Sequence, residues 1–147
     1  MLILGTLPGA ESLRRGQYYA HPRNAFWRLI GGVIERDLIN LPYDDRLEAL
    51  GRARIGLWDV IATASRRGSL DAAIRDTVRT DLVGLVERLP DLRAIAFNGG
   101  TASAVGRRQL SGIRAELVDL PSSSPAYAGM TVADKLARWC RLAEYLA

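Results

Sequence analysis

The sequence has 147 residues, a net charge of +4 and a hydrophobic fraction of 48%, which suits one globular domain with a core of its own. No apolar run approaches the roughly 20 residues that a membrane-spanning helix needs, and we see no signal peptide, so we expect a soluble cytoplasmic protein. The single cysteine, Cys140, excludes an internal disulfide and fits a reducing compartment. It follows Trp139 in a segment typical of a helix that packs on a core, so we expect a buried, inert thiol.

The basic residues are almost all arginine, since Lys135 is the only lysine. Seven of them lie in the first predicted loop, after the second predicted strand and at the end of a later helix: Arg14, Arg15 and Arg23; Arg66 and Arg67; Arg107 and Arg108. Arginine binds phosphate with a planar fork of donors, so this pattern favours a polyanionic partner. Ordinary solvated arginines are the alternative interpretation.

In chain order, residues 1–4 are apolar and predict a short buried strand. A Gly/Pro turn and a long polar and aromatic loop follow. Apolar residues then recur at helical spacing over 25–35, so we predict a helix there, with Asn24 as its N-cap. A turn at 41–45 leads into a short helix that ends near residue 50.

The second half of the chain alternates between strands and helices. The predicted order is strand 54–61, loop 62–70, a helical turn at 71–74, helix 78–89, strand 92–97, helix 101–110, strand 114–120 and helix 131–146, the last capped by Thr131. Alternation of this kind predicts an α/β domain whose parallel sheet has helices on both faces. The loops that follow the four strands should then gather at one edge of the sheet.

Several common sites are absent from the sequence. The turn at 5–9 lacks both the Gly-Lys-Ser/Thr ending of a P-loop and the spacing of a dinucleotide fingerprint. His21 is the only histidine and lies far from Cys140, so no zinc site is indicated. The serines at 122–124 have no nucleophile-elbow motif, which argues against a serine hydrolase. We therefore expect neither a metal nor an organic cofactor.

Six short motifs, in order along nearly the whole chain, carry a resemblance to a known family. They are GTLPG at 5–9, QYYAHPRNAFW at 17–27, LWDV at 57–60, GSLD at 68–71, FNG at 97–99 and LPSSSPA at 120–126. Together they resemble the uracil-DNA glycosylase superfamily, most closely its hypoxanthine-DNA glycosylase branch, also called DNA-deoxyinosine glycosylase. The resemblance implies a three-layer α/β/α fold with a short, mainly parallel four-stranded central sheet, which agrees with the pattern of elements.

The resemblance also implies an activity. Enzymes of this kind flip a deaminated base out of DNA and hydrolyse its N-glycosidic bond, and the branch implies hypoxanthine as the substrate, with uracil as a second one. The implied partner is damaged DNA, and a monomer is the default expectation. Two alternatives stay open: a catalytically weak or inactive relative that binds damaged DNA, and a flavodoxin-like module that binds a free nucleotide.

The resemblance assigns roles to individual residues. Tyr19 occupies the place of the aromatic residue that stacks on the base, and Asn24 that of the amide that positions the attacking water. Asp59 occupies a base-reading position, where a carboxylate accepts from hypoxanthine N1–H or uracil N3–H. Leu7 departs from the family pattern, because other branches carry an Asp or Asn there that activates water. The structural alternatives are a core tyrosine, an ordinary N-cap and a loop-capping aspartate.

Further residues are expected at the edges of the pocket. His21 should brace the first loop or bind the base oxygen, and Asn98 should contact the base. We expect serine hydroxyls, backbone N–H groups and arginines to bind the DNA backbone, from Ser122, Ser123, Ser124, Arg66, Arg67 and Arg23. A plain turn is the alternative interpretation of the serines.

Overall fold

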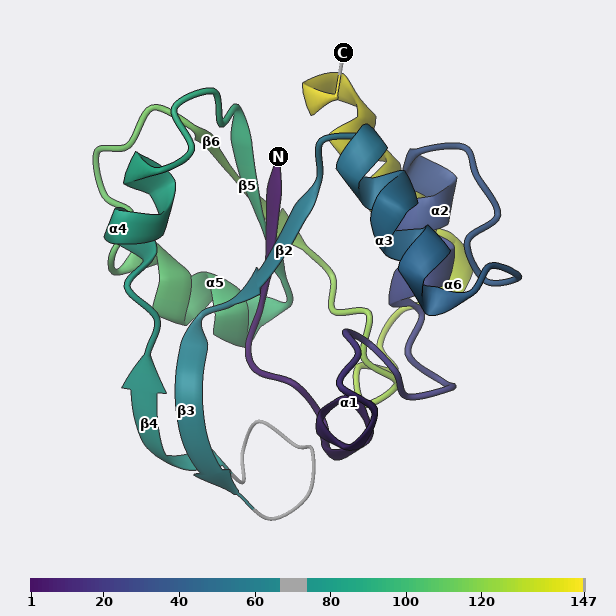
Figure 1. Ribbon diagram of the computed structural model, residues 1–147, viewed down its shortest axis with the longest axis horizontal. Helices are drawn as coiled ribbons and strands as arrows, with labels where there is room; N and C mark the ends of the chain where they lie inside the picture. Colours follow the sequence, from purple (N-terminus) through teal and green to yellow (C-terminus); the bar gives the residue numbers. More distant parts are fainter. Residues whose placement is uncertain (67–73, 147) are drawn as a thin grey trace.

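The structure of the protein, a computed structural model, describes residues 1–66 and 74–146, and within 63–78 it describes the backbone of those residues alone. Its elements (Figure 1) follow the chain in the order β1 (Leu2–Gly5), α1 (Ala10–Arg15), α2 (Phe26–Val33), α3 (Tyr43–Arg52), β2 (Gly56–Asp59), β3 (Ile61–Arg66), β4 (Ile74–Arg79), α4 (Leu82–Glu87), β5 (Ala94–Asn98), α5 (Gly100–Arg107), β6 (Glu116–Leu120), α6 (Val132–Trp139) and the 3-10 helix η2 (Cys140–Tyr145).

The main sheet has the strand order β2-β1-β5-β6, and each neighbouring pair is parallel. The central strands β1 and β5 are buried along their whole length, as expected for apolar strands that are covered on both faces. Their side chains alternate between two cores, so that Ile3 and Ala96 lie in one and Leu4 and Phe97 in the other. The prediction of a four-stranded parallel α/β sheet is confirmed.

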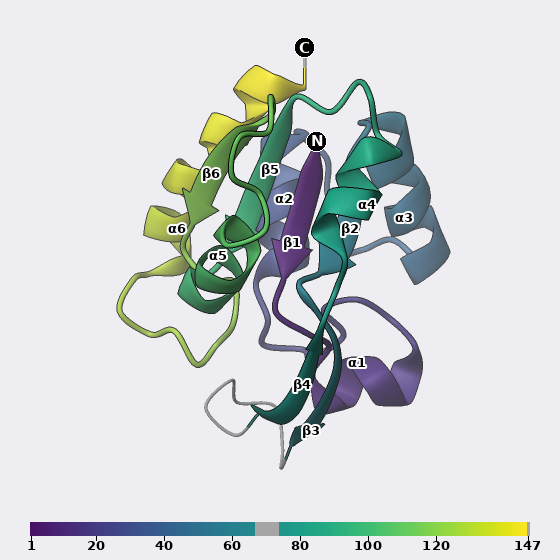
Figure 2. The same cartoon turned by 90° about the vertical axis from the view of Figure 1, so that its left-hand side faces the viewer.

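Helices cover both faces of this sheet and complete three layers, with α4 and α5 in front of it and α2 and α3 behind it in Figure 2. On one face, α2, α3 and α6 enclose a core that contains Ile3, Phe26 and Trp139. On the other face, α4 and α5 contribute Leu82 and Ala102 to a second core. The three-layer α/β/α architecture is therefore as predicted.

The two helices α2 and α6 approach closely at Gly32. A Cβ at this position would collide with Leu136 Cδ1, so a larger residue would have to displace the end of the Leu136 side chain. The rings of Phe26 and Trp139 also pack edge to face, with centroids 5.8 Å apart. These contacts fix α6 against α2, whose first turn borders the site described below.

The largest departure from the predicted elements is an antiparallel hairpin that follows β2. The predicted strand 54–61 bends at Val60 and divides into β2 and β3, so the predicted loop 62–70 begins as a strand. The helical turn predicted at 71–74 falls mostly outside the described residues, and its last residue begins β4, which pairs antiparallel with β3. Thr80 N–H donates to Val60 O at 2.9 Å and so ties the end of the hairpin back to its start.

The helix after this hairpin begins later than predicted. Val78, which the apolar pattern assigns to the start of that helix, lies in β4, in agreement with the preference of β-branched residues for strands. The helix α4 begins at Leu82 because Asp81 caps it, with Asp81 Oδ1 accepting from Gly84 N–H at 3.0 Å.

Other boundaries also change. Residues 10–15, predicted as part of a loop, form α1, and α3 begins at Tyr43, inside a predicted turn. The predicted terminal helix is α6 followed by η2. Its predicted cap is confirmed, because Thr131 Oγ1 accepts from Asp134 N–H at 3.1 Å.

Cys140 is exposed, so the prediction of a buried thiol is wrong. The buried side of α6 carries Lys135 and Trp139, four residues apart, as expected for one face of a helix. Cys140 follows Trp139 directly and is rotated by about 100° from it around the helix axis, toward solvent.

Candidate active site at the carboxyl edge of the sheet

The carboxyl ends of the parallel strands open into a cleft of about 1000 Å³. This edge of the sheet lies at the lower side of Figure 1, next to α1. It is lined by Gly5 at the end of β1 and residues 6–9 after it, by Asp59 at the end of β2, by Asn98 at the end of β5 and by residues 122–127 after β6. The prediction that the strand-end loops gather at one edge is confirmed for the loops after β1, β5 and β6. The predicted loop 62–70 does not join them, because its described part belongs to β3 and the rest lies outside the described residues.

Most of the residues implied by the resemblance line this cleft. They are Leu7, Tyr19, His21, Arg23, Asn24, Asp59, Asn98, Ser122, Ser123 and Ser124. Arg66 ends β3, where the backbone alone is described, and Arg67 lies outside the described residues. The DNA contacts of Arg66 and Arg67 therefore stay predictions.

Tyr19 has a left-handed backbone, with φ of 53°, which is uncommon for a bulky residue and occurs in constrained functional loops. Its ring stacks on Phe26, with centroids 3.9 Å apart and planes 17° from parallel. One face of the ring is thus covered, and a base can stack only on the other. Burial raises the pKa of the Tyr19 hydroxyl; a hydrogen bond with Asn98 lowers it, and the charge of Asp59 raises it further.

Gly5 allows Tyr19 and Asp59 to meet at the end of β1. A Cβ on Gly5 would lie 2.8 Å from the Tyr19 hydroxyl oxygen and 2.8 Å from Asp59 Oδ1, so any side chain there would displace these groups. Gly5 is also the register partner of Asp59 between β1 and β2. The parallel pairing of the strands thus brings the Asp59 carboxylate close to the Tyr19 hydroxyl.

Asp59 is half-buried and places a negative charge at this point of the cleft. Burial, together with the Asp59 charge, raises the pKa of Tyr18 to about 12, and the same charge acts on Tyr19. An ionised carboxylate accepts hydrogen bonds and donates none. The site therefore favours a ligand that turns an N–H toward Asp59.

Asn24 lies one residue before the N-cap of α2, which is Ala25, so the predicted cap is displaced by one position. Its Oδ1 nevertheless accepts from Phe26 N–H at 2.9 Å, as a capping side chain would. An amide oxygen has two lone pairs, so the same atom can also accept from a water in the cleft. The backbone is held too, because Ala25 N–H donates to Ser123 O at 3.0 Å.

His21 and Leu7 border the cleft in different ways. His21 is exposed, and its Nδ1 accepts from Arg23 N–H at 3.1 Å, which closes the turn after Tyr19 and supports the bracing role. Leu7 packs against the core around Leu4. A leucine side chain has no polar atom, so it cannot orient a water.

Asn98 and Ser123 direct their polar groups toward each other instead of toward a ligand in the cleft. Asn98 Nδ2 donates to Ser123 Oγ at 2.9 Å, and Ser123 N–H donates to Asn98 Oδ1 at 2.9 Å. Ser123 is only 1% exposed, and its N–H is already donated inside the protein. This geometry favours a supporting role for Ser123, and its contact with phosphate stays a prediction. For Asn98 this geometry favours a supporting role over a direct contact with the base.

Ser122 and Ser124 remain at the cleft and are partly exposed. Ser122 Oγ accepts from Ser124 N–H at 3.1 Å, and Ser124 Oγ accepts from Ala126 N–H at 3.2 Å. These bonds define short serine turns. A hydroxyl that accepts still has its own O–H to donate, so both serines can donate to a phosphate oxygen.

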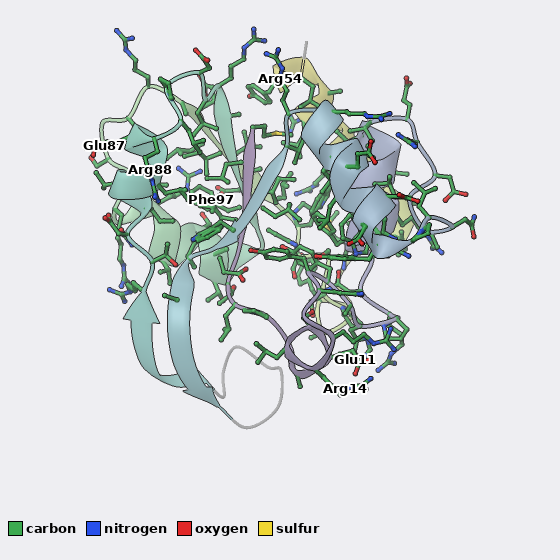
Figure 3. All side chains as sticks on the ribbon, in the orientation of Figure 1. Glu11, Arg14, Arg54, Glu87, Arg88 and Phe97 are labelled. Carbon is green, nitrogen blue, oxygen red and sulfur yellow. The ribbon has the colours of Figure 1, made fainter. Side chains whose placement is uncertain are left out.

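The helix α1 forms one wall of the cleft. Glu11 lines the cleft and its carboxylate binds Arg14 and Arg15, each at 2.6 Å; Glu11 and Arg14 lie together on α1 in Figure 3. The Arg14 guanidinium holds the pKa of Glu11 below its usual range. Ser12 is buried, and its Oγ accepts from Ala20 N–H at 3.0 Å, which joins α1 to the loop that carries Tyr19.

Lys135, which was not predicted as a site residue, binds the loop after β6 from the helix α6. Lys135 Nζ donates to Tyr127 O at 2.9 Å and to Ser124 O at 3.4 Å. Its sequence signal is the spacing of four residues from Trp139, which places both on the buried face of α6.

Among the side chains that the structure describes, those of residues 1–62 and 79–146, no three of His, Cys, Asp or Glu gather closely enough to hold a metal ion. In the same part of the chain, every helix is too short or too polar to cross a membrane.

Comparisons with known proteins show which family the chain resembles. Residues 1–143 match the family model of the uracil DNA glycosylase superfamily. The chain is 47% identical over 126 residues to a hypoxanthine DNA glycosylase of Methanosarcina acetivorans, an alignment that covers 86% of this chain and 79% of that protein. It is 48% identical over 99 residues to a protein of the same name from Methanosarcina barkeri, covering 67% of this chain and 63% of that one.

A solved structure has the same architecture. It is an NMR structure of a Methanosarcina acetivorans protein that is named as a candidate uracil DNA glycosylase. It superposes with a TM-score of 0.86 at 42% identity, over 99% of this chain and 89% of that chain.

Proposed function

Because the chain belongs to the uracil DNA glycosylase superfamily, we propose that it is a DNA glycosylase that removes hypoxanthine from DNA, with uracil as a second substrate. The observation that carries the proposal is the meeting of Tyr19, Asn24 and Asp59 in one cleft. Two relatives bear the name hypoxanthine DNA glycosylase. The cleft volume lies at the upper end of the roughly 300–1,000 Å³ of small-molecule sites, which is enough for one extruded nucleotide.

Base recognition follows from two side chains. The damaged base is extruded from the duplex at a cost of about a few kcal/mol. The Tyr19 ring takes it on the face that Phe26 leaves open, a contact worth about 1–3 kcal/mol. Asp59 accepts from N1–H of hypoxanthine. Adenine has no N1–H, so the carboxylate disfavours the undamaged base.

Hydrolysis then needs a water at the sugar. The C1′–N9 bond breaks, its electron pair leaves with the base, and the sugar passes through an oxocarbenium-like state. Asn24 orients a water whose oxygen bonds to C1′, and the proton released ends on the departing base. Leu7 adds no polar group, so the Asn24 amide orients the water without help from a second side chain. We therefore expect slow turnover.

The rim of the cleft supplies the contacts to the DNA backbone. Ser122 and Ser124 can donate hydroxyl protons to phosphate oxygens, and the exposed Arg23 brings a positive charge to the same cleft. Such contacts position the duplex without reading its sequence. We further propose that the protein acts as a monomer in the cytoplasm.

The test uses labelled duplexes that contain hypoxanthine, uracil or neither, incubated with the protein and then treated with alkali, which cuts the strand where a base is missing. We expect strand cleavage at hypoxanthine, weaker cleavage at uracil and none in the undamaged duplex. Absence of cleavage at both damaged bases, with an enzyme of known activity as the positive control, would contradict the proposal.

Leu7 favours a second candidate, a relative that binds damaged DNA without efficient chemistry. The same experiment separates the two functions, because such a protein would shift the hypoxanthine duplex in a native gel and leave it uncut after alkali.

A further inference from the structure

Lys135 is a charged residue whose side chain is buried. It is the only lysine of the sequence, and on α6 its exposed fraction is 4%. Burial lowers the pKa of its ammonium group. A buried ammonium is unfavourable unless hydrogen bonds replace its lost water, so the groups that it binds indicate its role.

These groups belong to the loop after β6. Lys135 Nζ donates to the carbonyl oxygens of Tyr127 and Ser124, and it lies 5.1 Å from the centroid of the Tyr127 ring, a distance typical of cation–π contacts. Lys135 thus holds Tyr127 by both its backbone and its ring.

Other residues hold the first part of the same loop. Trp139, one turn further along α6, donates its Nε1–H to Pro121 O at 2.9 Å. Ser123 is bound by Asn98 and by Ala25 N–H. Removing the Lys135 ammonium should therefore loosen residues 124–127 and leave Ser123 in place.

Tyr127 lines the cleft with 44% of its surface exposed. An aromatic ring that is already fixed loses little entropy on binding, and exposed rings stack on nucleobases. We propose that Lys135 is a positioning residue that presents the Tyr127 ring to a DNA base beside the extruded nucleotide. This inference rests on the proposed function, because it takes DNA as the ligand of the cleft.

The experiment compares Lys135→Met, Tyr127→Ala and the double variant on a hypoxanthine duplex, with enzyme in excess. Each protein then gives a maximal cleavage rate and a half-saturating concentration. Methionine keeps most of the volume of the lysine stem but removes the ammonium group. Lys135→Arg tests rescue by a retained charge, and Arg138→Met removes a positive charge from an exposed position of the same helix as the matched control.

We expect Lys135→Met and Tyr127→Ala each to raise the half-saturating concentration about tenfold, the loss of one stacking contact. The maximal rate should hardly change, because Asn24 and Tyr19 are untouched. The double variant should match Tyr127→Ala alone, Lys135→Arg should recover most of the loss, and Arg138→Met should match the wild type.

The inference would be overturned if the increases in half-saturating concentration multiplied in the double variant, or if Lys135→Met had the half-saturating concentration of the wild type. In either case the lysine would not act through Tyr127. Should the methionine variant fail to fold, Lys135→Gln, whose amide can still donate to one carbonyl, takes its place in the same comparison. A wild type that cleaves nothing would contradict the proposed function instead. The affinities of the same proteins for the duplex, measured by fluorescence anisotropy, would still test Lys135 in that case.

Discussion

Asn98 and Ser123 are joined by two hydrogen bonds of 2.9 Å, one donated by each residue. Asn98 ends β5 and Ser123 lies in the loop after β6, so the pair fixes that loop to the edge of the sheet. Tyr19 joins the same group through its hydrogen bond with Asn98. Tyr19 and the loop after β6 therefore both bind Asn98, which is buried.

We expect Asn98→Ala to lower the free energy of unfolding by about 2 kcal/mol, because it leaves the buried N–H and hydroxyl of Ser123 without their partner. Urea denaturation measures the change. Ser122→Ala is the control, since Ser122 is only partly buried, and it should cost less than about 0.5 kcal/mol. Equal losses in the two variants would contradict the supporting role of Asn98.

Tyr19→Leu should weaken binding of a hypoxanthine duplex about tenfold, because the base loses its aromatic partner. Tyr19→Phe keeps the ring and its contact with Phe26, so its affinity should stay near that of the wild type. Fluorescence anisotropy with the two variants separates the ring from the hydroxyl. A phenylalanine variant as weak as the leucine variant would assign the binding to the hydroxyl.

Asn24→Ala should lower the maximal cleavage rate by about 10²-fold, since water positioning acts in the chemical step, and should leave DNA affinity almost unchanged. The alanine also removes the acceptor of Phe26 N–H, so Asn24→Ser is the matched variant: serine can accept at a helix start but is too short to reach the same water. We expect the serine variant to be as stable as the wild type, with a maximal cleavage rate as low as that of the alanine variant. Wild-type cleavage by either variant would remove Asn24 from the mechanism.

Asp59→Asn should reduce cleavage at hypoxanthine about tenfold or more, because a hydrogen bond to a charged acceptor is worth about 1.5–3 kcal/mol. Cleavage at uracil should fall by a similar factor, since uracil also offers an N–H. Glu11→Gln is the control, as Glu11 is a second carboxylate of the cleft that is engaged by Arg14 and Arg15. Equal losses in both variants would indicate a general charge effect instead of base recognition.

The tyrosine pKa values predict how stability changes at alkaline pH. The pKa of Tyr18 is raised from 10 to about 12 by burial, and that of Tyr19 is also raised, chiefly by burial. The folded protein thus holds these protons more tightly than the unfolded chain. The stability that they contribute is complete below pH 10 and is lost as the pH rises through the folded-state pKa.

We therefore expect the free energy of unfolding to fall above about pH 10, and to fall less steeply in a Tyr19→Phe variant. Urea denaturation at several pH values tests this. Lys135, whose pKa is lowered by burial, contributes with the opposite sign in both proteins, so their difference isolates Tyr19. Parallel curves would show that the Tyr19 proton does not couple to folding.

Local pattern determined the sheet and the place of the site. Short apolar runs alternate with segments of helical spacing, and this pattern predicted four parallel strands. Parallel strands place the loops at their carboxyl ends on one edge of the sheet, which is where the cleft lies. Local pattern failed where a segment is held by distant partners. The hairpin of β3 and β4 is tied to Val60 through Thr80, twenty residues along the chain.

Residue type and motif order placed Tyr19, Asn24 and Asp59 together, but only the tertiary structure decided which neighbouring polar group faces the cleft. Ser122 and Ser123 are identical in type and adjacent in sequence, yet Ser123 is buried because Asn98 from another strand binds it. Lysine is usually found at the surface, yet Lys135 is buried because carbonyl groups of a different loop replace its water. The spacing from Trp139 indicates the helix face on which Lys135 lies. Whether a polar group there is buried depends on partners far along the chain, and the local sequence does not identify these partners.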